Sequence, residues 1–201
     1  MKYIFCCLFA LLLLGCSNGK QEQPSPAYTL SEEELSHLQS GDIIFRMGYG
    51  AMSLSIVSIL NDSIKVSHCG IVVRGSAGLK IVHTISQSLS DADGMQECTV
   101  EEFIADSREN SIAAVRFKHA DKQQIADKAI YYLDKKIPFD SYFDLIDSSA
   151  FFCSELPMRI LKDEFNFDLL QGGESLMQNC KFSTFFDPQY FQVIINHHLR
   201  K

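Results

Sequence analysis

Two short segments contain residues whose types are suited to nucleophilic catalysis. Cys153 lies in the sequence Phe-Phe-Cys-Ser-Glu-Leu-Pro, which predicts the start of a helix, and His68 lies in an apolar, β-branched run at 66–73. A helix N-terminus stabilises a thiolate, and its backbone N–H groups can hold the oxyanion formed when the thiolate attacks a carbonyl carbon. Histidine titrates in the range that a general base requires. The pair therefore predicts a cysteine hydrolase.

Each of these two residues also has a purely structural explanation. Cysteines outside disulfides are among the most buried residue types, and a single histidine on a strand is often a core residue. Cys69, beside His68, points to the other face of the strand by alternation, so we interpret it as packing. The catalytic interpretation requires the fold to bring Cys153 and His68 together.

His83 is the third candidate, in a second β-rich run at 79–85. Gly-Ser-Ala-Gly at 75–78 joins the two runs and predicts a hairpin. A symmetric register about this turn places His83 opposite Gly70, with His68 as its diagonal neighbour on the same face. His83 would then orient the base. The alternative is an exposed polar strand residue, because a slip of one position moves every side chain to the other face.

The remaining pattern predicts one α+β domain, with an antiparallel sheet packed against helices and no internal repeat. Ser31 and Thr99 each precede a glutamate by three residues, which is the pattern of a capping box at a helix start. Helices are expected at 31–39, within 47–61, from 99 onward, at 121–135 and at 153–165. Strands are expected at 43–46, 66–74, 79–85, 111–117 and 190–195.

The composition argues against several classes of protein. The chain has 201 residues and a formal net charge of −7, without a basic patch, which gives no support for nucleic-acid binding. The same charge argues against adhesion to anionic lipid. Neither a Cys-x-x-Cys nor a His-x-x-x-His spacing occurs, so we predict no metal site.

The N-terminus predicts export and a lipid anchor. Lys2 precedes an apolar run at 3–14 that is too short to span a bilayer, as in an export signal. Leu-Leu-Gly-Cys, ending at Cys16, resembles a bacterial lipobox, in which the cysteine is lipidated. An ordinary signal peptide cleaved nearby is the alternative. We therefore expect a protein of the bacterial cell envelope, on its periplasmic or outer face, held to the membrane through this anchor only.

These features divide the chain into a signal peptide at 1–15, a polar tether at 16–28 and a single domain at 29–201. The tether is polar and contains proline, so it cannot bury a core. Among the cysteines of the mature chain, Cys98 with Cys180 is the one disulfide that we consider.

Five motifs occur in order over residues 40–160. They are Gly-Asp-Ile-Ile from Gly41, Ser-His-Cys-Gly-Ile-Val from Ser67, Val-His ending at His83, Pro-Phe-Asp ending at Asp140, and Phe-Cys-Ser-Glu-Leu around Cys153. Together they resemble the motifs of the YiiX/YebB-like hydrolases, a circularly permuted branch of the NlpC-type, papain-like cysteine hydrolases.

The resemblance implies a circularly permuted papain-like fold in which the histidine precedes the cysteine. Cys153 matches the nucleophile, His68 the base, and His83 the third polar position, where relatives often have an acidic residue. Four further motif residues are expected to bind substrate or to support the site structurally: Asp42, Ser67, Asp140 and Glu155.

The activity that the resemblance implies is cleavage of an amide bond, without a cofactor, through a thioacyl intermediate. The expected substrates are cell-wall peptides, such as peptidoglycan fragments, or similar small amides. Two alternatives stay open. One is a lipid acyl hydrolase or acyltransferase of the same fold, and the other is a catalytically silent binding lipoprotein.

Some acidic residues have two interpretations. Glu155 faces solvent or caps the helix start, where its charge suits the dipole. The loop with Asp140, Asp144 and Asp147 binds a substrate amine or is simply solvated. Asp42 is expected to bond local backbone at the turn into the first strand.

Two other groups near the C-terminal half are less specific. The aromatic residues at 142–143 and 151–152 line a pocket or pack behind one. His197 and His198 are expected to lie in an exposed tail.

Overall fold

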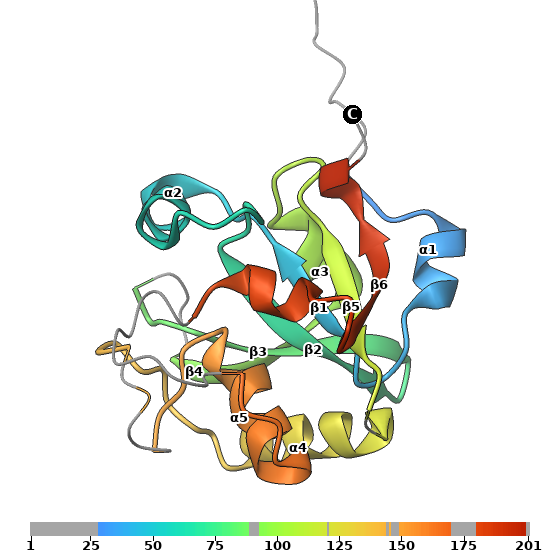
Figure 1. The fold of residues 1–201 in the computed structure, drawn as a ribbon, viewed down its shortest axis with the longest axis vertical. Coiled ribbons are helices and arrows are strands. Elements are labelled where there is room, and N and C mark those ends of the chain that lie inside the picture. Colours follow the sequence, from blue (N-terminus) through green and yellow to red (C-terminus); the bar gives the residue numbers. More distant parts are fainter. Residues whose placement is uncertain are drawn as a thin grey trace, which may run out of the picture.

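The protein folds around one antiparallel sheet. The computed structural model describes residues 28–88, 93–119, 121–143, 145, 149–169 and 180–199. Within these residues six strands form a sheet in the order β4-β3-β2-β1-β5-β6 (Figure 1). The strands are β1 (Ile43–Arg46), β2 (His68–Gly75), β3 (Gly78–Ile85), β4 (Gly94–Thr99), β5 (Ala113–Phe117) and β6 (Phe191–Asn196). The predicted α+β class with an antiparallel sheet is confirmed.

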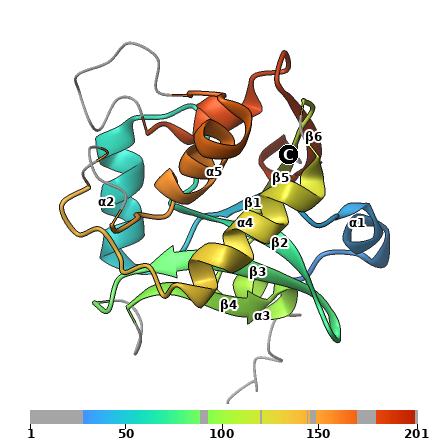
Figure 2. The ribbon, with the colours of Figure 1, turned by 90° about the horizontal axis from the view of Figure 1, so that it is seen from below.

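Helices cover both faces of the sheet (Figure 2). The helices are α1 (Glu32–His37), α2 (Gly50–Leu60), α3 (Val100–Ala105), α4 (Lys122–Asp134) and α5 (Glu155–Phe165), with 3-10 helices η1 (Phe182–Phe186) and η2 (His197–Leu199). One core lies between the sheet and α4, α5 and η1, and contains Cys69, Ile71 and Val73 of β2. A second core lies under α3 and contains Val72 of β2. The alternation of side chains along a strand thus supplies both cores.

The predicted helix starts are confirmed by their caps. Ser31 forms a capping box with Glu34, and Thr99 forms one with Glu102. In each box the hydroxyl accepts a backbone N–H of the first turn, and the glutamate accepts the N–H of the cap residue. These local bonds need only residues three apart, which is why the sequence pattern reveals them.

Strand β4 was not expected from the sequence. It lies at the edge of the sheet and pairs with β3 alone, with Ile81 opposite Cys98. Its residues, Gly-Met-Gln-Glu-Cys-Thr, become exposed toward the end of the strand and show no regular alternation of apolar side chains. An edge strand with little burial gives a weak period-two pattern.

The C-terminal histidines correct another expectation. His197 is buried, and its two ring nitrogens contact the Tyr28 hydroxyl at 2.5 Å and the Glu34 carboxylate at 2.6 Å. The prediction of an exposed tail is therefore wrong for His197. These contacts hold α1 and the end of β6 together, which is a packing that no local pattern encodes.

The predicted signal peptide, Cys16 and the tether up to residue 27 lie outside the described residues. Within the part of the chain that the structure describes, no helix combines the length and the apolar character needed to cross a membrane.

Candidate active site

Cys153 lies in a tight turn immediately before α5. The helix begins at Glu155, so the predicted start at Cys153 is two residues early. The carbonyl of Phe152 accepts the backbone N–H groups of Glu155 and Leu156 at 3.1 and 3.3 Å, which closes the turn. Phe151 anchors the turn from the other side, because its carbonyl accepts the Thr84 hydroxyl of β3 at 3.2 Å.

The turn packs where β2 and β3 separate. The ladder between these strands ends at the pair Ile71–Val82, although both strands continue beyond it. The backbone N–H of Cys69 is consequently outside the ladder and bonds to the Cys153 sulfur. In return, the thiol of Cys69 donates to the carbonyl oxygen of Cys153 at 3.2 Å.

These contacts favour the anionic form of Cys153. A hydrogen bond from the Cys69 side chain, together with the backbone N–H groups of Cys69 and Ser154, lowers the pKa of Cys153, and this effect exceeds the opposing effect of burial. Burial raises the pKa of Cys69 itself well above its ordinary value, so Cys69 is the proton donor of the two. The interpretation of Cys69 as packing alone missed this contact, since a strand pattern does not show which helix will cover which face.

The two candidate histidines are in direct contact. The Nε2 atom of His68 lies 2.9 Å from the Nδ1 atom of His83. The hairpin pairs Ile71 with Val82 and Gly75 with Gly78, which is the predicted register that sets His83 opposite Gly70. A Cβ atom at Gly70 would lie 2.9 Å from the Val82 carbonyl oxygen and 3.1 Å from the His83 Cβ. Glycine therefore lets the two strands, and the two histidines, approach closely.

Both imidazoles are neutral near pH 7. Burial, and then repulsion by His83 and Arg46, holds the pKa of His68 well below its ordinary value. Burial, and then Arg46, lowers the pKa of His83 to about 4. In a neutral pair, one ring donates its N–H and the other accepts. Phe103 of α3 contacts both rings, with ring centroids 5.8 and 6.1 Å apart.

The histidine pair and Cys153 lie at the same end of β2 but on different faces of the sheet. His68 packs against Phe103 on the α3 side, whereas Cys69 faces the core under α4 and α5, where Cys153 also packs. No hydrogen bond joins Cys153 to either histidine, all three being described residues. His68 uses Nε2 for His83, so Nδ1 is the ring nitrogen that this contact does not occupy.

A cavity of about 150 Å³ opens at Cys153. Among the described residues, its lining contains no charged side chain and comes from α2, from the aromatic residues beside the turn and from η1: Met52, Ser55, Ile56, Ile59, Leu60, Phe143, Phe152, Cys153, Ser154, Cys180 and Phe182. The expectation that some of the aromatic residues line a pocket is therefore confirmed for Phe143 and Phe152.

The disulfide considered between Cys98 and Cys180 is absent. Cys180 lines the cavity at Cys153, whereas Cys98 lines a separate cavity of about 170 Å³ beside His83 and Arg46. The two thiols thus belong to different faces of the sheet.

All four supporting candidates have structural partners, Asp42 and Ser67 among the strands. The Asp42 carboxylate accepts the backbone N–H of Gln39 at 2.8 Å, which is the local bond expected for it. It also accepts Nε and Nη2 of Arg116 at 2.7 and 2.8 Å. The Ser67 hydroxyl accepts the backbone N–H of Gly48 at 3.0 Å. Both side chains are buried, and they hold the strands that carry the site.

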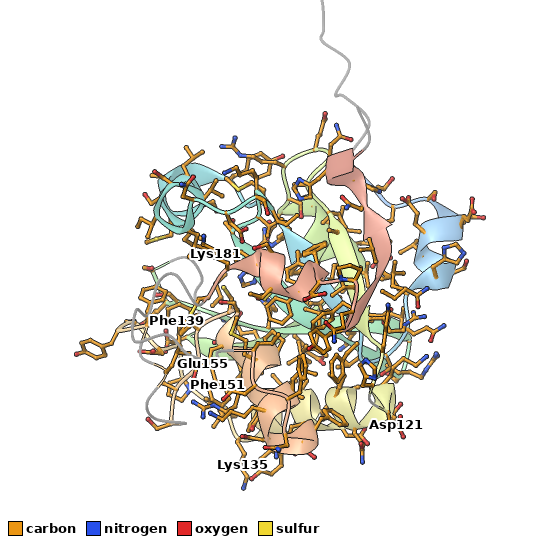
Figure 3. All side chains as sticks on the ribbon, in the orientation of Figure 1. Asp121, Lys135, Phe139, Phe151, Glu155 and Lys181 are labelled. Atoms are coloured by element: carbon orange, nitrogen blue, oxygen red, sulfur yellow. The ribbon has the colours of Figure 1, made fainter. Side chains whose placement is uncertain are left out.

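The acidic candidates near the turn are also buried. Asp140 accepts the backbone N–H of Tyr142 at 2.8 Å, while Asp144 and Asp147 lie outside the described residues. Glu155, at the start of α5 (Figure 3), is only 1% exposed and pairs with Arg159 at 2.9 Å. The expectation that Glu155 faces solvent is wrong, but it does accept the N–H of Phe152 at the helix start, at 3.4 Å. Burial raises its pKa to about 7.

Comparison with known proteins finds a solved structure of similar fold. No family model matches the sequence, and no curated protein matches it. Among solved structures, a protein described as the metalloprotein YiiX from Escherichia coli O157:H7 matches with a TM-score of 0.60. The chain has the fold of YiiX. The match covers 80% of this chain and 98% of YiiX, at 16% sequence identity, so the likeness is one of fold alone.

Proposed function

We propose that this protein is a cysteine hydrolase with Cys153 as its nucleophile, in a YiiX-like fold that is a permuted version of the papain-like arrangement. The observation that carries the proposal is the setting of the Cys153 sulfur. It lies beside a cavity, before a helix, and hydrogen bonds from Cys69 and Ser154 favour its thiolate form. A thiolate is the form of cysteine that attacks a carbonyl carbon.

A metal centre does not fit the side chains of this site. YiiX is described as a metalloprotein, but no group of three or more His, Cys, Asp and Glu in the described chain is placed to hold a metal. His68 and His83 bond to each other, and Cys153 lies on the other face of the sheet. No step of the mechanism is therefore assigned to a metal.

The reaction begins with the thiolate. The Cys153 sulfur forms a bond to the substrate carbonyl carbon, and the carbonyl oxygen becomes an oxyanion. The sulfur loses its negative charge in this step, so we expect the backbone N–H groups of Cys69 and Ser154, which bond to the thiolate, to donate to the oxyanion instead. The oxyanion then collapses and breaks the bond to the leaving amine or alcohol, which takes from His68 the proton that His68 received from the Cys153 thiol. Water hydrolyses the resulting thioester and regenerates the thiol.

His68 serves as the base and acid, and His83 positions it. When Nδ1 of His83 accepts the Nε2–H of His68, the free lone pair of His68 is at Nδ1. We expect this nitrogen and the sulfur to approach each other in the substrate complex, past the end of the β2–β3 ladder. The hydrogen bond between them forms in the substrate complex, as apo sites often have long catalytic contacts.

The cavity favours a substrate with an apolar acyl group. Cell-wall peptides, which the sequence resemblance suggests, carry carboxylates and amines for which the described part of the lining offers no charged partner. An acyl chain gains about 0.8 kcal/mol for each buried CH₂ group. The alternative of a lipid acyl hydrolase or acyltransferase is therefore the one that the structure favours over amide cleavage in peptides.

Hydrolysis of matched p-nitrophenyl esters and of muropeptides tests both levels of the proposal. We expect the octanoyl ester to be cleaved with a higher kcat/KM than the acetyl ester, and muropeptides to be left intact. Cys153→Ala should abolish cleavage, whereas Cys180→Ala, which removes another thiol from the same cavity, should retain it. Equal activity in Cys153→Ala would show that Cys153 is not the nucleophile. Cleavage of muropeptides alone would show that the substrate is a peptide and not an acyl ester.

A further inference from the structure

Apolar side chains gather on the surface around α2. Of the eight exposed large hydrophobic residues of the described chain, six lie at the N-terminal end and outer side of α2 or in the adjoining loop: Tyr49, Met52, Leu54, Ile59, Tyr142 and Phe143. Met52, Leu54 and Ile59 are 46%, 51% and 56% exposed. Met52 and Ile59 are seven residues apart and share one face of the helix, whereas Leu54 lies on its other side. Exposed apolar side chains gathered in one region mark an interaction site in soluble domains.

The helix itself turns no charge outward, and Ser55 and Ser58 are its exposed polar residues. Its sequence, Gly-Ala-Met-Ser-Leu-Ser-Ile-Val-Ser-Ile-Leu, contains no charged residue, and none of its residues is buried. Figures 1 and 2 both show α2 beside the sheet rather than across either of its faces. A partner that binds this surface therefore meets apolar side chains and serine hydroxyls and no charged group of the helix.

The apolar surface is continuous with the cavity at Cys153. Met52, Ile59 and Phe143 belong to both, so a molecule that enters the cavity crosses this surface. Tyr49, which precedes α2, and Tyr142, which precedes Phe143, are 61% and 92% exposed. Tyrosine, with an apolar ring and a polar hydroxyl, is favoured at the boundary between apolar and aqueous phases.

We propose that α2 and Phe143 dock on the surface of a lipid bilayer and admit an acyl chain from it to Cys153. The docking stands on the exposed surface, and the delivery of substrate rests on the proposed function. The predicted lipid anchor at Cys16 supports a bilayer as the partner, because twelve residues up to Tyr28 reach at most about 40 Å. The net charge of −7 favours contact with zwitterionic rather than anionic lipid.

Tryptophan fluorescence tests the docking, since the chain contains no tryptophan. Leu54→Trp places a single probe on α2 outside the cavity lining, in the full chain reconstituted in phosphatidylcholine vesicles with brominated acyl chains. We expect its emission to shift to shorter wavelength and to be quenched. Tyr131→Trp is the matched control, because Tyr131 is 50% exposed on α4 and away from this surface. It should show neither effect, although the same N-terminus anchors both variants.

An unquenched Leu54→Trp probe, or equal quenching of both probes, would overturn the docking. A blue shift that grows with protein concentration without vesicles would also overturn it, since a second copy would then cover α2. Adding Cys153→Ala separates the two proposals. Quenching that persists without any Cys153-dependent hydrolysis supports docking and refutes the enzyme, whereas hydrolysis with an unquenched probe does the reverse.

A surface charge provides a functional readout. Leu54→Glu should slow hydrolysis of phosphatidylcholine in vesicles, while hydrolysis of a soluble ester stays unchanged, because Leu54 does not line the cavity. Equal hydrolysis of vesicle lipid by Leu54→Glu and the parent chain would contradict the docking.

Discussion

The Cys153 sulfur obtains much of its stabilisation as an anion from a residue on the sheet. The side chain and the backbone N–H of Cys69 both bond to it, and Ser154 adds a further backbone N–H from the turn before α5. A hydrogen bond to a charged group is worth about 1.5–3 kcal/mol, more than a neutral one. The reactivity of Cys153 therefore depends on where β2 and β3 separate as well as on the helix.

Cys69→Ala should raise the pKa of Cys153, because it removes the side-chain donor and keeps the backbone N–H. Alkylation of Cys153 by iodoacetamide at pH 7 should slow roughly tenfold, and its pH profile should move to higher pH. Mass spectrometry of the peptide that contains Cys153 measures the rate. Cys180→Ala, in the same cavity, should leave the profile in place. An unchanged profile in Cys69→Ala would show that its thiol does not support the thiolate.

His68→Gln should lower kcat/KM for the octanoyl ester by about 10²–10⁴-fold, the usual range for a lost general acid and base. The rate of Cys153 alkylation should change much less, since the Cys69 and Ser154 donors remain. His83→Gln should have a smaller effect on kcat/KM, because it disturbs the orientation of His68 and leaves the base itself present. A larger loss in His83→Gln than in His68→Gln would reverse these roles.

At the scale of elements, the turn into β1 connects the sheet to α4. Gly41 has φ +91°, and its N–H donates to the carbonyl of Val72 at 2.8 Å. A Cβ atom at this position would overlap the carbonyl oxygen of Lys122 at the start of α4. The close approach of α4 to the strand pair β1–β2 therefore requires glycine here.

Gly41→Ala should lower the free energy of unfolding by about 2–4 kcal/mol, through left-handed strain and steric overlap together. Gly50→Ala is the control, because Gly50 has φ +84° with open space around its Cα. Gly50→Ala should lower the free energy of unfolding by about 1–2 kcal/mol, through the left-handed strain alone. Urea unfolding measures both variants, and equal losses would show that the contact with α4 is not limiting.

At the scale of the whole molecule, the free energy of unfolding depends on pH through two buried glutamates whose pKa values shift in opposite directions. Although burial opposes it, hydrogen bonds from His197 and Ser31 lower the pKa of Glu34 to about 2. Its contribution to stability is therefore present above the unfolded value of 4.5 and is lost as the pH falls toward 2. The pKa of Glu155 is raised to about 7, so its contribution is present below 4.5 and is lost as the pH rises through 7.

Glu155→Gln should remove the decline in unfolding free energy that Glu155 causes between pH 4.5 and 7, up to about 3 kcal/mol. Glutamine can still accept the Arg159 hydrogen bond, so the geometry of the helix start is kept. Urea unfolding over this pH range measures the slope. Glu33→Gln, on the exposed side of α1, should keep the parent slope, and an equally steep decline in Glu155→Gln would contradict the assignment.

Local sequence patterns specify most of the helices and strands without reference to tertiary contacts. The capping boxes at Ser31 and Thr99, the strand Ile43–Arg46 and the register of the β2–β3 hairpin all follow from residues close together in the chain. The contact of His68 with His83 belongs to the same class, since it spans one hairpin. Periodicity and turn chemistry act over a few residues, so the sequence by itself predicts them.

The tertiary structure alone decided which elements cover each face of the sheet. The contact between Cys69 and Cys153 joins residues 84 apart, and that between Glu34 and His197 joins residues 163 apart. The burial of Glu155 and the exposure of α2 likewise depend on packing, because an apolar segment does not specify its partner. Hydrophobic burial is non-directional, so the sequence indicates that the α2 segment is apolar, and only the fold shows that its residues stay exposed or half-buried.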